Sequence, residues 1–149
     1  MAKLLRFASL AELKEWATRP KATPRVSSLS PRVSEDDEQM ALIARAQLYA
    51  YQYPALSLLI HIPNGGKRHI VEAKRFRALG VKAGMPDLIL FYMARGYGAW
   101  CGELKAMDGK IETEQRRIVA ELRARGYFAD FFFGQDAAWA SLMWYLEKE

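Results

Sequence analysis

The middle of the chain reads Gly84-Met-Pro-Asp87-Leu-Ile-Leu-Phe-Tyr92 and, after a short turn, Ala99-Trp-Cys-Gly-Glu103-Leu-Lys105-Ala106. Both runs are short, apolar and bounded by turn residues, which is the pattern of buried strands. Gly96 and Gly98 lie between the two runs, and they favour a turn that folds the second strand back beside the first. The stretch therefore predicts a β-hairpin.

Three charged residues interrupt these apolar runs. Side chains alternate between the two faces of a strand, so Glu103 and Lys105 share one face while Leu104 points to the other. The hairpin brings Asp87, at the head of the first strand, towards Glu103. Taken alone, Asp87 after a proline is typical of a turn, and Glu103 with Lys105 is typical of a solvated ion pair. Together in apolar strands they indicate a site for Mg²⁺ or Mn²⁺, since unpaired buried charge is costly and carboxylates are the ligands of these ions.

The order of motifs along the chain resembles a known family. Pro86-Asp87 followed by Glu103-Leu-Lys105 resembles the PD-(D/E)xK nuclease signature. Around it stand Ile62-Pro-Asn-Gly-Gly-Lys-Arg68, a basic helix, Gly80-Val-Lys-Ala-Gly-Met-Pro-Asp87-Leu and, at a helix start, Glu114-Gln115. This order is similar to stand-alone phage and bacterial VRR-NUC (virus-type replication-repair nuclease) domains, over roughly Ser34 to the C-terminus. The resemblance implies the α/β class, with a restriction-endonuclease-like mixed β-sheet flanked by helices.

The resemblance also implies the roles of individual residues. The catalytic residues it implies are Asp87, Glu103, Lys105 and Gln115. The metal ligands it implies, for one or two Mg²⁺ or Mn²⁺ ions, are Glu35, Asp87, Glu103 and the carbonyl of Leu104. The first-helix glutamate is expected one turn ahead of a glutamine. Glu35 stands four residues before Gln39 and shares its face, so we prefer Glu35, and the adjacent Glu38 stays the alternative.

A glycine turn and a basic helix follow the first predicted strand. The basic residues of this segment are Lys67, Arg68, Lys74, Arg75, Arg77 and Lys82, against the single acid Glu72. Such a segment is suited to binding phosphates, although a solvated helix face would have the same composition. The predicted DNA contacts are Asn64, Lys67, Arg68, Lys74 and Arg75, and the resemblance places the first three beside the active site.

Size and composition exclude several classes of protein. The chain has 149 residues, 51% of them hydrophobic and 26% charged, which is typical of one soluble domain. No apolar run approaches the ~20 residues of a membrane span, and no signal peptide is evident. We therefore expect a cytoplasmic protein of a bacterium or a phage host. Cys101 is the single cysteine of the sequence, so an internal disulfide is excluded, and we expect it to be a buried thiol. One cysteine and two histidines at unrelated spacings do not form a zinc site.

The positive charge is concentrated before the predicted nuclease domain. Residues 1–33 hold seven basic and two acidic residues, so this segment has a net charge of +5. The whole chain also has a net charge of +5, so the remaining residues are balanced. The second half of this segment is rich in proline and serine, which predicts an extended linker. We therefore divide the chain into a basic arm, 1–33, and a domain, 34–149. The arm would contact DNA phosphates or a partner subunit, or serve as a solubilising tail.

Apolar periodicity and turn residues predict the remaining elements. The predicted order is helix 34–53, strand 56–62, a basic helix, strand 87–92, strand 99–106, helix 113–125, strand 127–133 and helix 135–148. Ser34 with Asp37 resembles a capping box at the first helix. The apolar stripe of that helix is expected at Met40, Ile43, Ala44, Gln47, Leu48 and Tyr51. The aromatic C-terminal helix is expected to pack inward, and it is the one candidate for an exposed apolar surface.

These features predict a metal-dependent, structure-specific DNA endonuclease. Nothing in the chain resembles a base-reading motif, so selectivity should concern DNA shape. The resemblance implies a homodimer that cuts four-way (Holliday) junctions. The alternatives are a monomeric flap or single-strand nuclease, a non-catalytic DNA-binding module, and a structural subunit that recruits a replication partner.

Overall fold

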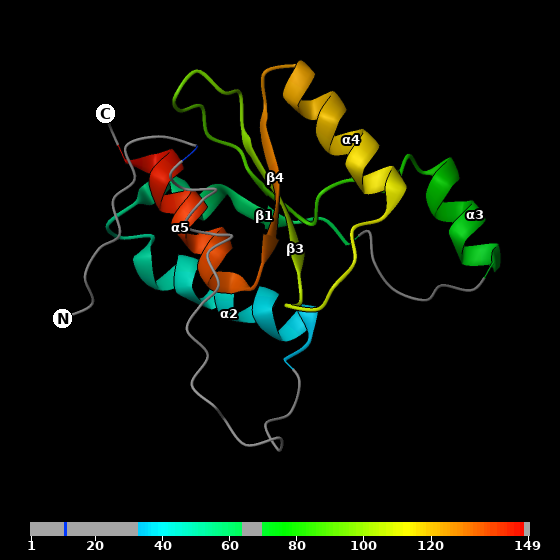
Figure 1. The fold of residues 1–149 in the computed structure, drawn as a ribbon, viewed down its shortest axis with the longest axis horizontal. Coiled ribbons are helices and arrows are strands. Elements are labelled where there is room, and N and C mark those ends of the chain that lie inside the picture. The colour runs from blue at the N-terminus through cyan, green and yellow to red at the C-terminus, as the bar shows by residue number, and fades with distance from the viewer. Residues whose placement is uncertain (1–10, 12–32, 64–69, 148–149) are drawn as a thin grey trace.

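The computed structural model describes residue 11 and residues 33–63 and 70–147, which form a four-stranded sheet flanked by helices (Figure 1). The predicted α/β class and mixed sheet are confirmed. The predicted arm lies almost wholly outside the described residues, as do Asn64, Lys67 and Arg68, so the proposed division at residue 33 stays a prediction. Of the helices that the structure describes, none has both the length and the apolar character needed to cross a bilayer.

The elements follow the predicted order. They are α2 (Glu35–Tyr49), a 3-10 helix η1 (Pro54–Leu58), β1 (Leu59–His61), α3 (Ile70–Ala78), β2 (Leu88–Leu90), β3 (Trp100–Lys105), α4 (Thr113–Ala124), β4 (Phe128–Phe133) and α5 (Gln135–Leu146). The strands lie in the order β1-β2-β3-β4. The pairs β1–β2 and β2–β3 are antiparallel, whereas β3–β4 is parallel and is connected through α4. The strands β1, β2 and β3 thus form a meander that includes the predicted hairpin.

The start of α2 agrees with the sequence, but the segment after it does not. The Ser34 side chain accepts a hydrogen bond from the Asp37 N–H, and the Asp37 carboxylate accepts one from the Ser34 N–H, so the capping box is confirmed. The helix ends at Tyr49, not Tyr53, and the predicted strand 56–62 begins only at Leu59. The reason is Pro54, which starts a 3-10 turn, and a short apolar run does not distinguish such a turn from a strand.

The predicted apolar stripe of α2 is wrong except at Ile43, which is partly buried and packs against the core. Met40 and Leu48 are exposed, and Tyr51 is 99% exposed, whereas the fully buried positions of the helix are Leu42 and Ala46. The helix carries apolar residues on more than one face, so periodicity alone does not choose between them. Packing against α5 makes the choice, because the side of α2 with Leu42 and Ala46 fits against that helix closely.

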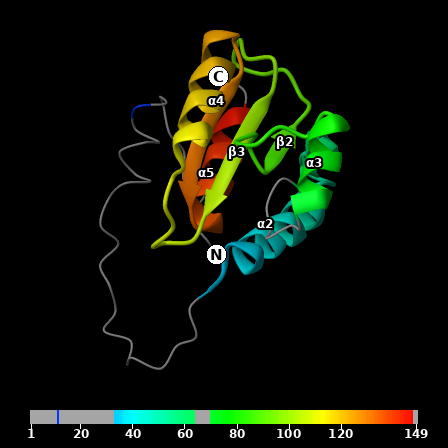
Figure 2. The same ribbon diagram turned by 90° about the vertical axis from the view of Figure 1, so that its right-hand side faces the viewer.

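One face of the sheet carries the main core, under α2 and α5 (Figures 1 and 2). Trp100 stacks on Phe132 at 5.4 Å between ring centroids, and its indole N–H donates to the Ser141 hydroxyl at 2.8 Å. A side chain at Gly102 would collide with the Trp100 ring, so glycine is required there. Helix α5 is buried from Ala137 to Tyr145, which excludes it as an exposed apolar surface.

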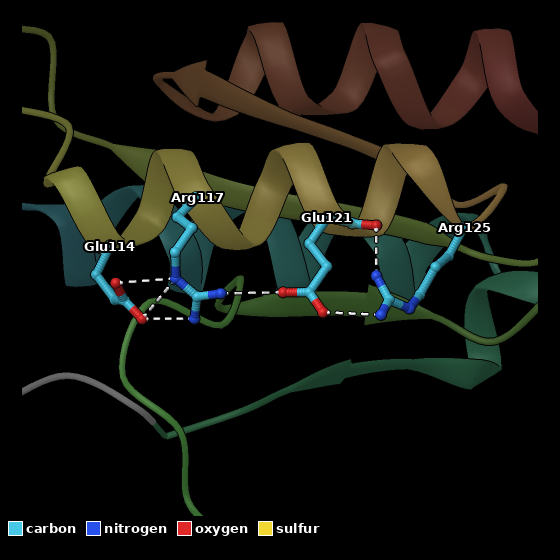
Figure 3. A network of polar contacts seen from close by, with 4 residues as sticks. All are labelled: Glu114, Arg117, Glu121 and Arg125. Carbon is cyan, nitrogen blue, oxygen red and sulfur yellow. Dashed lines mark hydrogen bonds and ion pairs between the residues drawn. The ribbon is translucent and has the colours of Figure 1, made fainter.

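The opposite face carries a smaller cluster under α4. It consists of Ile89, Ala99, Cys101, Val119 and Ala129. Cys101 is buried as predicted, and burial raises the pKa of its thiol to about 11. The outer side of α4 is covered by ion pairs that link Glu114, Arg117, Glu121 and Arg125 in a row (Figure 3). This face therefore has a thin apolar layer below a helix with a charged exterior.

Candidate active site

The strand register brings the two carboxylates of the hairpin to one end of the sheet. Leu88 pairs with Gly102, so Asp87 comes just before this pair on one strand and Glu103 just after it on the other. Because side chains alternate along β3, Glu103 and Lys105 lie on the α4 face with Cys101. The predicted convergence of Asp87, Glu103 and Lys105 is thus a consequence of the pairing.

Glu103 is almost completely buried and lies at the centre of this group. Its Oε1 is 3.0 Å from the Lys105 ammonium and also accepts a hydrogen bond from the Gln115 amide nitrogen. Its second oxygen, Oε2, is buried and has no hydrogen-bond partner in the described part of the chain. A buried carboxylate oxygen without a partner lowers the stability of the fold, and a bound ligand would remove this penalty.

Glu35 and Glu38, the two first-helix candidates, do different things. Glu35 Oε1 lies 3.6 Å from the Lys105 ammonium, so Glu35 reaches the carboxylate group from α2. Glu38 Oε2 accepts a hydrogen bond of 2.7 Å from the backbone N–H of Gln135, the first residue of α5. Glu38 therefore caps α5, and Glu35 is the glutamate that faces the site.

Gln115 is held in one orientation. The backbone N–H of Glu112 donates to its Oε1 at 2.8 Å. The amide nitrogen is then the end that faces Glu103, and as a donor it matches the carboxylate. Gln115 thus lies where the resemblance placed it, and its orientation follows from the capping box at the start of α4.

The backbone of Leu104 is directed towards Asp87. The carbonyl of Lys105 accepts a hydrogen bond from the Gly134 N–H on the β4 side, so the backbone groups of Leu104, the residue before it, are directed to the opposite side, towards β2 and Asp87. The N–H and C=O of one strand residue point to the same side, so the Leu104 carbonyl faces the same side as Asp87. This oxygen is a further candidate ligand beside the carboxylates.

Burial and mutual repulsion shift the pKa values of these groups. Burial raises the pKa of Asp87, and burial together with the charge of Asp87 raises the pKa of Glu103 to about 7. Burial lowers the pKa of Lys105, but its hydrogen bond to Glu103 and the nearby carboxylates outweigh this, and the net pKa is raised. Lys105 is therefore a cation at neutral pH, between carboxylates that repel each other.

The donor set fits a hard divalent cation. Within the described ranges, no three His, Cys, Asp or Glu side chains are already gathered as a metal cluster. The Lys105 ammonium instead lies between Glu35 and Glu103. The unpartnered Glu103 Oε2 and the raised pKa values of Asp87 and Glu103 are features that a bound cation would relieve.

His61, an exposed residue that the sequence did not assign to the site, lies next to Asp87. Its Nδ1 donates to the backbone carbonyl of Asp87 at 3.0 Å. His61 pairs with Leu88, the residue after Asp87. The sequence shows that His61 ends the first strand, but only the strand order shows that β1 is the neighbour of β2.

The predicted DNA contacts are only partly within the described residues. Lys74 and Arg75 are exposed on α3, which extends away from the sheet at one end of the molecule (Figure 1). Asn64, Lys67 and Arg68 belong to the segment that the structure does not describe. The observed part of this surface is therefore a basic helix beyond the α4 side of the sheet.

The four-stranded mixed sheet flanked by helices is of the restriction-endonuclease-like fold type. Among solved structures, one described as a "VRR_NUC domain protein" matches with a TM-score of 0.68 and 24% sequence identity, covering 78% of this chain and 91% of that one. The likeness confirms the predicted VRR-NUC-type fold. No family model and no curated protein matches the sequence.

Proposed function

We propose that this chain is a divalent-metal-dependent nuclease that hydrolyses phosphodiester bonds in DNA. One observation carries the proposal: Glu103 and Lys105 are buried on one sheet face beside Asp87, and Glu35 and Gln115 reach them from two helices. Adjacent buried carboxylates destabilise a fold, so a purely structural role does not account for them. The nuclease type agrees with the name of the similar structure.

The chain's own residues would hold the ion and position the phosphate. The proposed ligands are Asp87, Glu103, Glu35 and the Leu104 carbonyl. A bound Mg²⁺ or Mn²⁺ supplies positive charge at the phosphoryl oxygen and lowers the pKa of its water. Gln115 occupies Glu103 Oε1 and so leaves Oε2 for the ion.

Lys105 would act as a cation rather than as a base. Its raised pKa keeps the ammonium protonated at neutral pH. A protonated lysine orients the attacking water by hydrogen bonding and offsets the negative charge that develops on the phosphate in the transition state. A base role would require the Lys105 pKa to fall, which the neighbouring carboxylates oppose.

DNA would approach from the α3 side. Lys74 and Arg75 offer exposed positive charge there, with Asn64, Lys67 and Arg68 as further proposed contacts. Arg117 and Arg125 are less suitable, because they are bound to Glu114 and Glu121 (Figure 3). Phosphate contacts of this kind bind without base specificity, which agrees with selectivity for DNA shape.

We propose four-way junctions as the substrate and a homodimer as the active form, on the family resemblance alone. A two-fold dimer would place two active sites on symmetric strands. Large apolar side chains are exposed at Leu48, Tyr51 and Met93, and a subunit contact would cover residues of this kind. Size-exclusion chromatography with light scattering tests the dimer independently of cleavage.

The decisive experiment is cleavage of matched fluorescent DNAs by the wild-type protein and by Lys105→Ala. The DNAs are a linear duplex, a single strand, a 5′ flap and a four-way junction, each with Mg²⁺, Mn²⁺ or EDTA. The matched control is Lys110→Ala, which removes an exposed lysine from the loop after β3. We expect paired cuts in the junction that need metal, and a loss of about a thousandfold with Lys105→Ala alone, at nearly unchanged DNA affinity.

Other outcomes would select the alternatives. Cleavage of flaps or single strands by a monomer would replace the junction proposal within the same enzyme class. Binding without cleavage under every condition would leave a non-catalytic DNA-binding module. A Lys105→Ala protein that also loses DNA binding would contradict the assigned role of Lys105.

A further inference from the structure

The loop between α3 and β2 touches the start of α4 at Gly84. Gly84 has a φ of +79°, and a Cβ built on it would stand 2.8 Å from the carbonyl carbon and oxygen of Glu114 and 3.0 Å from the nitrogen of Gln115. Carbon atoms do not approach backbone atoms this closely, and backbone atoms cannot rotate away as a side chain can. A side chain at position 84 would therefore push the first turn of α4 away from the loop.

The first turn of α4 carries Gln115. Its amide is bound at both ends, because Oε1 accepts from the Glu112 N–H and Nε2 donates to Glu103 Oε1. A side chain held in this way has no free rotation with which to absorb a displacement of its backbone. A shift of the turn would therefore carry Gln115 away from Glu103.

The other end of the same loop leads into Asp87. Only Met85 and Pro86 separate Asp87 from Gly84, and Pro86 is fully buried with its φ restricted by the ring. The path from Gly84 to Asp87 is thus short and stiff. The contact at Gly84 joins the head of β2, which carries Asp87, to the start of α4, which carries Gln115.

We propose that Gly84 is a positioning residue for the site. By having no side chain, it lets the loop rest on the first turn of α4, and this contact sets the reach of Gln115 to Glu103. Gly84 touches no reacting group and acts through Gln115. The kinetic consequence rests on the proposed nuclease function, whereas the structural consequence does not.

Gly80 provides a matched control in the same loop. It also has a positive φ, +92°, but a Cβ there meets nothing within 4 Å. Asparagine tolerates the left-handed region better than other residues with a side chain. Gly84→Asn and Gly80→Asn therefore place similar demands on the backbone and differ in the collision with α4.

The first test is the NMR signal of the Gln115 side-chain amide, assigned by its loss in Gln115→Ala. We expect this signal to move towards the position of a free amide in Gly84→Asn and to stay unchanged in Gly80→Asn. An unchanged signal in folded Gly84→Asn would overturn the proposal. So would a Gly84→Asn chain that fails to fold while Gly80→Asn folds, because Gly84 would then support the fold as a whole.

The second test is the kinetics of DNA cleavage. We expect Gly84→Asn to lower kcat by about tenfold or more with KM changed by less than about twofold, and Gly80→Asn to match the wild type. If Gly84 acts through Gln115, the double variant Gly84→Asn/Gln115→Ala is no slower than Gln115→Ala alone. Independent, multiplying effects would contradict the proposal. A wild-type protein that cuts no DNA would instead refute the nuclease function and leave the NMR test decisive for Gly84.

Discussion

On one face of the sheet, α2 and α5 cover β3 with a continuous apolar core that contains Trp100 and Leu104. On the other face, α4 covers Cys101 with a small cluster, and the next two residues of β3 on that face are Glu103 and Lys105. The same strand thus supplies the core with one set of side chains and the candidate site with the alternate set.

This contrast shows how the fold tolerates a destabilising site. Burial and mutual repulsion raise the pKa of Glu103 to about 7 and also raise that of Asp87, so the charged forms are held at a cost. The large aromatic core on the α5 face supplies the opposing stability. Stability and the charged site are provided by different faces of β3. Each substitution on this strand therefore affects mainly one of the two.

The largest effect is expected from truncating the packed face. Trp100→Ala should lower the free energy of unfolding by about 3–5 kcal/mol, since it removes a buried indole that stacks on Phe132. Cys101→Ala, the next residue on the opposite face, should cost less than about 1.5 kcal/mol. Urea denaturation followed by circular dichroism measures both. Equal losses would contradict the difference between the faces.

The two glutamates of α2 test the difference between the faces, because Glu35 contacts Lys105 in the candidate site and Glu38 caps α5 over the core. Glu35→Gln should lower cleavage by about a hundredfold, or about 2.7 kcal/mol in activation free energy, with little loss of stability. Glu38→Gln should leave cleavage nearly intact and cost about 1 kcal/mol, because it weakens the cap on α5. Cleavage kinetics and urea denaturation separate the two variants. The reverse pattern would make Glu38 the site residue.

The charged face should make stability depend on pH. The pKa of Glu103 is raised from its ordinary 4.5 to about 7, so the folded state binds more protons than the unfolded state between these values. Stability in EDTA should therefore fall as pH rises from 4.5 to 7, by an amount on the order of 1–3 kcal/mol. Denaturation of wild-type protein and Glu103→Gln across this range measures it. The same slope in both proteins would rule out Glu103 as the cause.

The smallest effect is expected from the exterior of α4. Arg117→Ala breaks the row of ion pairs with Glu114 and Glu121 shown in Figure 3, but these side chains are exposed. Exposed pairs contribute little and are screened by salt. The thermal midpoint should fall slightly at low salt and not at all at high salt. A large loss at high salt would mean that the row supports the fold.

Local patterns were sufficient for most elements and for the convergence of the charged residues of the hairpin. The glycine turn and the two apolar runs predicted the hairpin, and the alternation of β3 predicted that Glu103 and Lys105 share a face. The face of α2 was predicted wrongly, because Met40 and Leu48 fit a helical period as well as Leu42 does. The 3-10 turn at Pro54 was missed for the same reason, since apolar composition does not specify the backbone.

Hairpin pairing, strand alternation and the capping box at Ser34 follow from neighbouring residues, and the amino-acid sequence was enough to establish them. The tertiary structure alone decided three other features. Glu35 contacts Lys105 whereas Glu38 caps α5, His61 lies next to Asp87, and Gly84 contacts α4. The physical reason is that each of these contacts joins segments far apart in the chain. Their distances depend on how helices and strands pack, which no local period encodes.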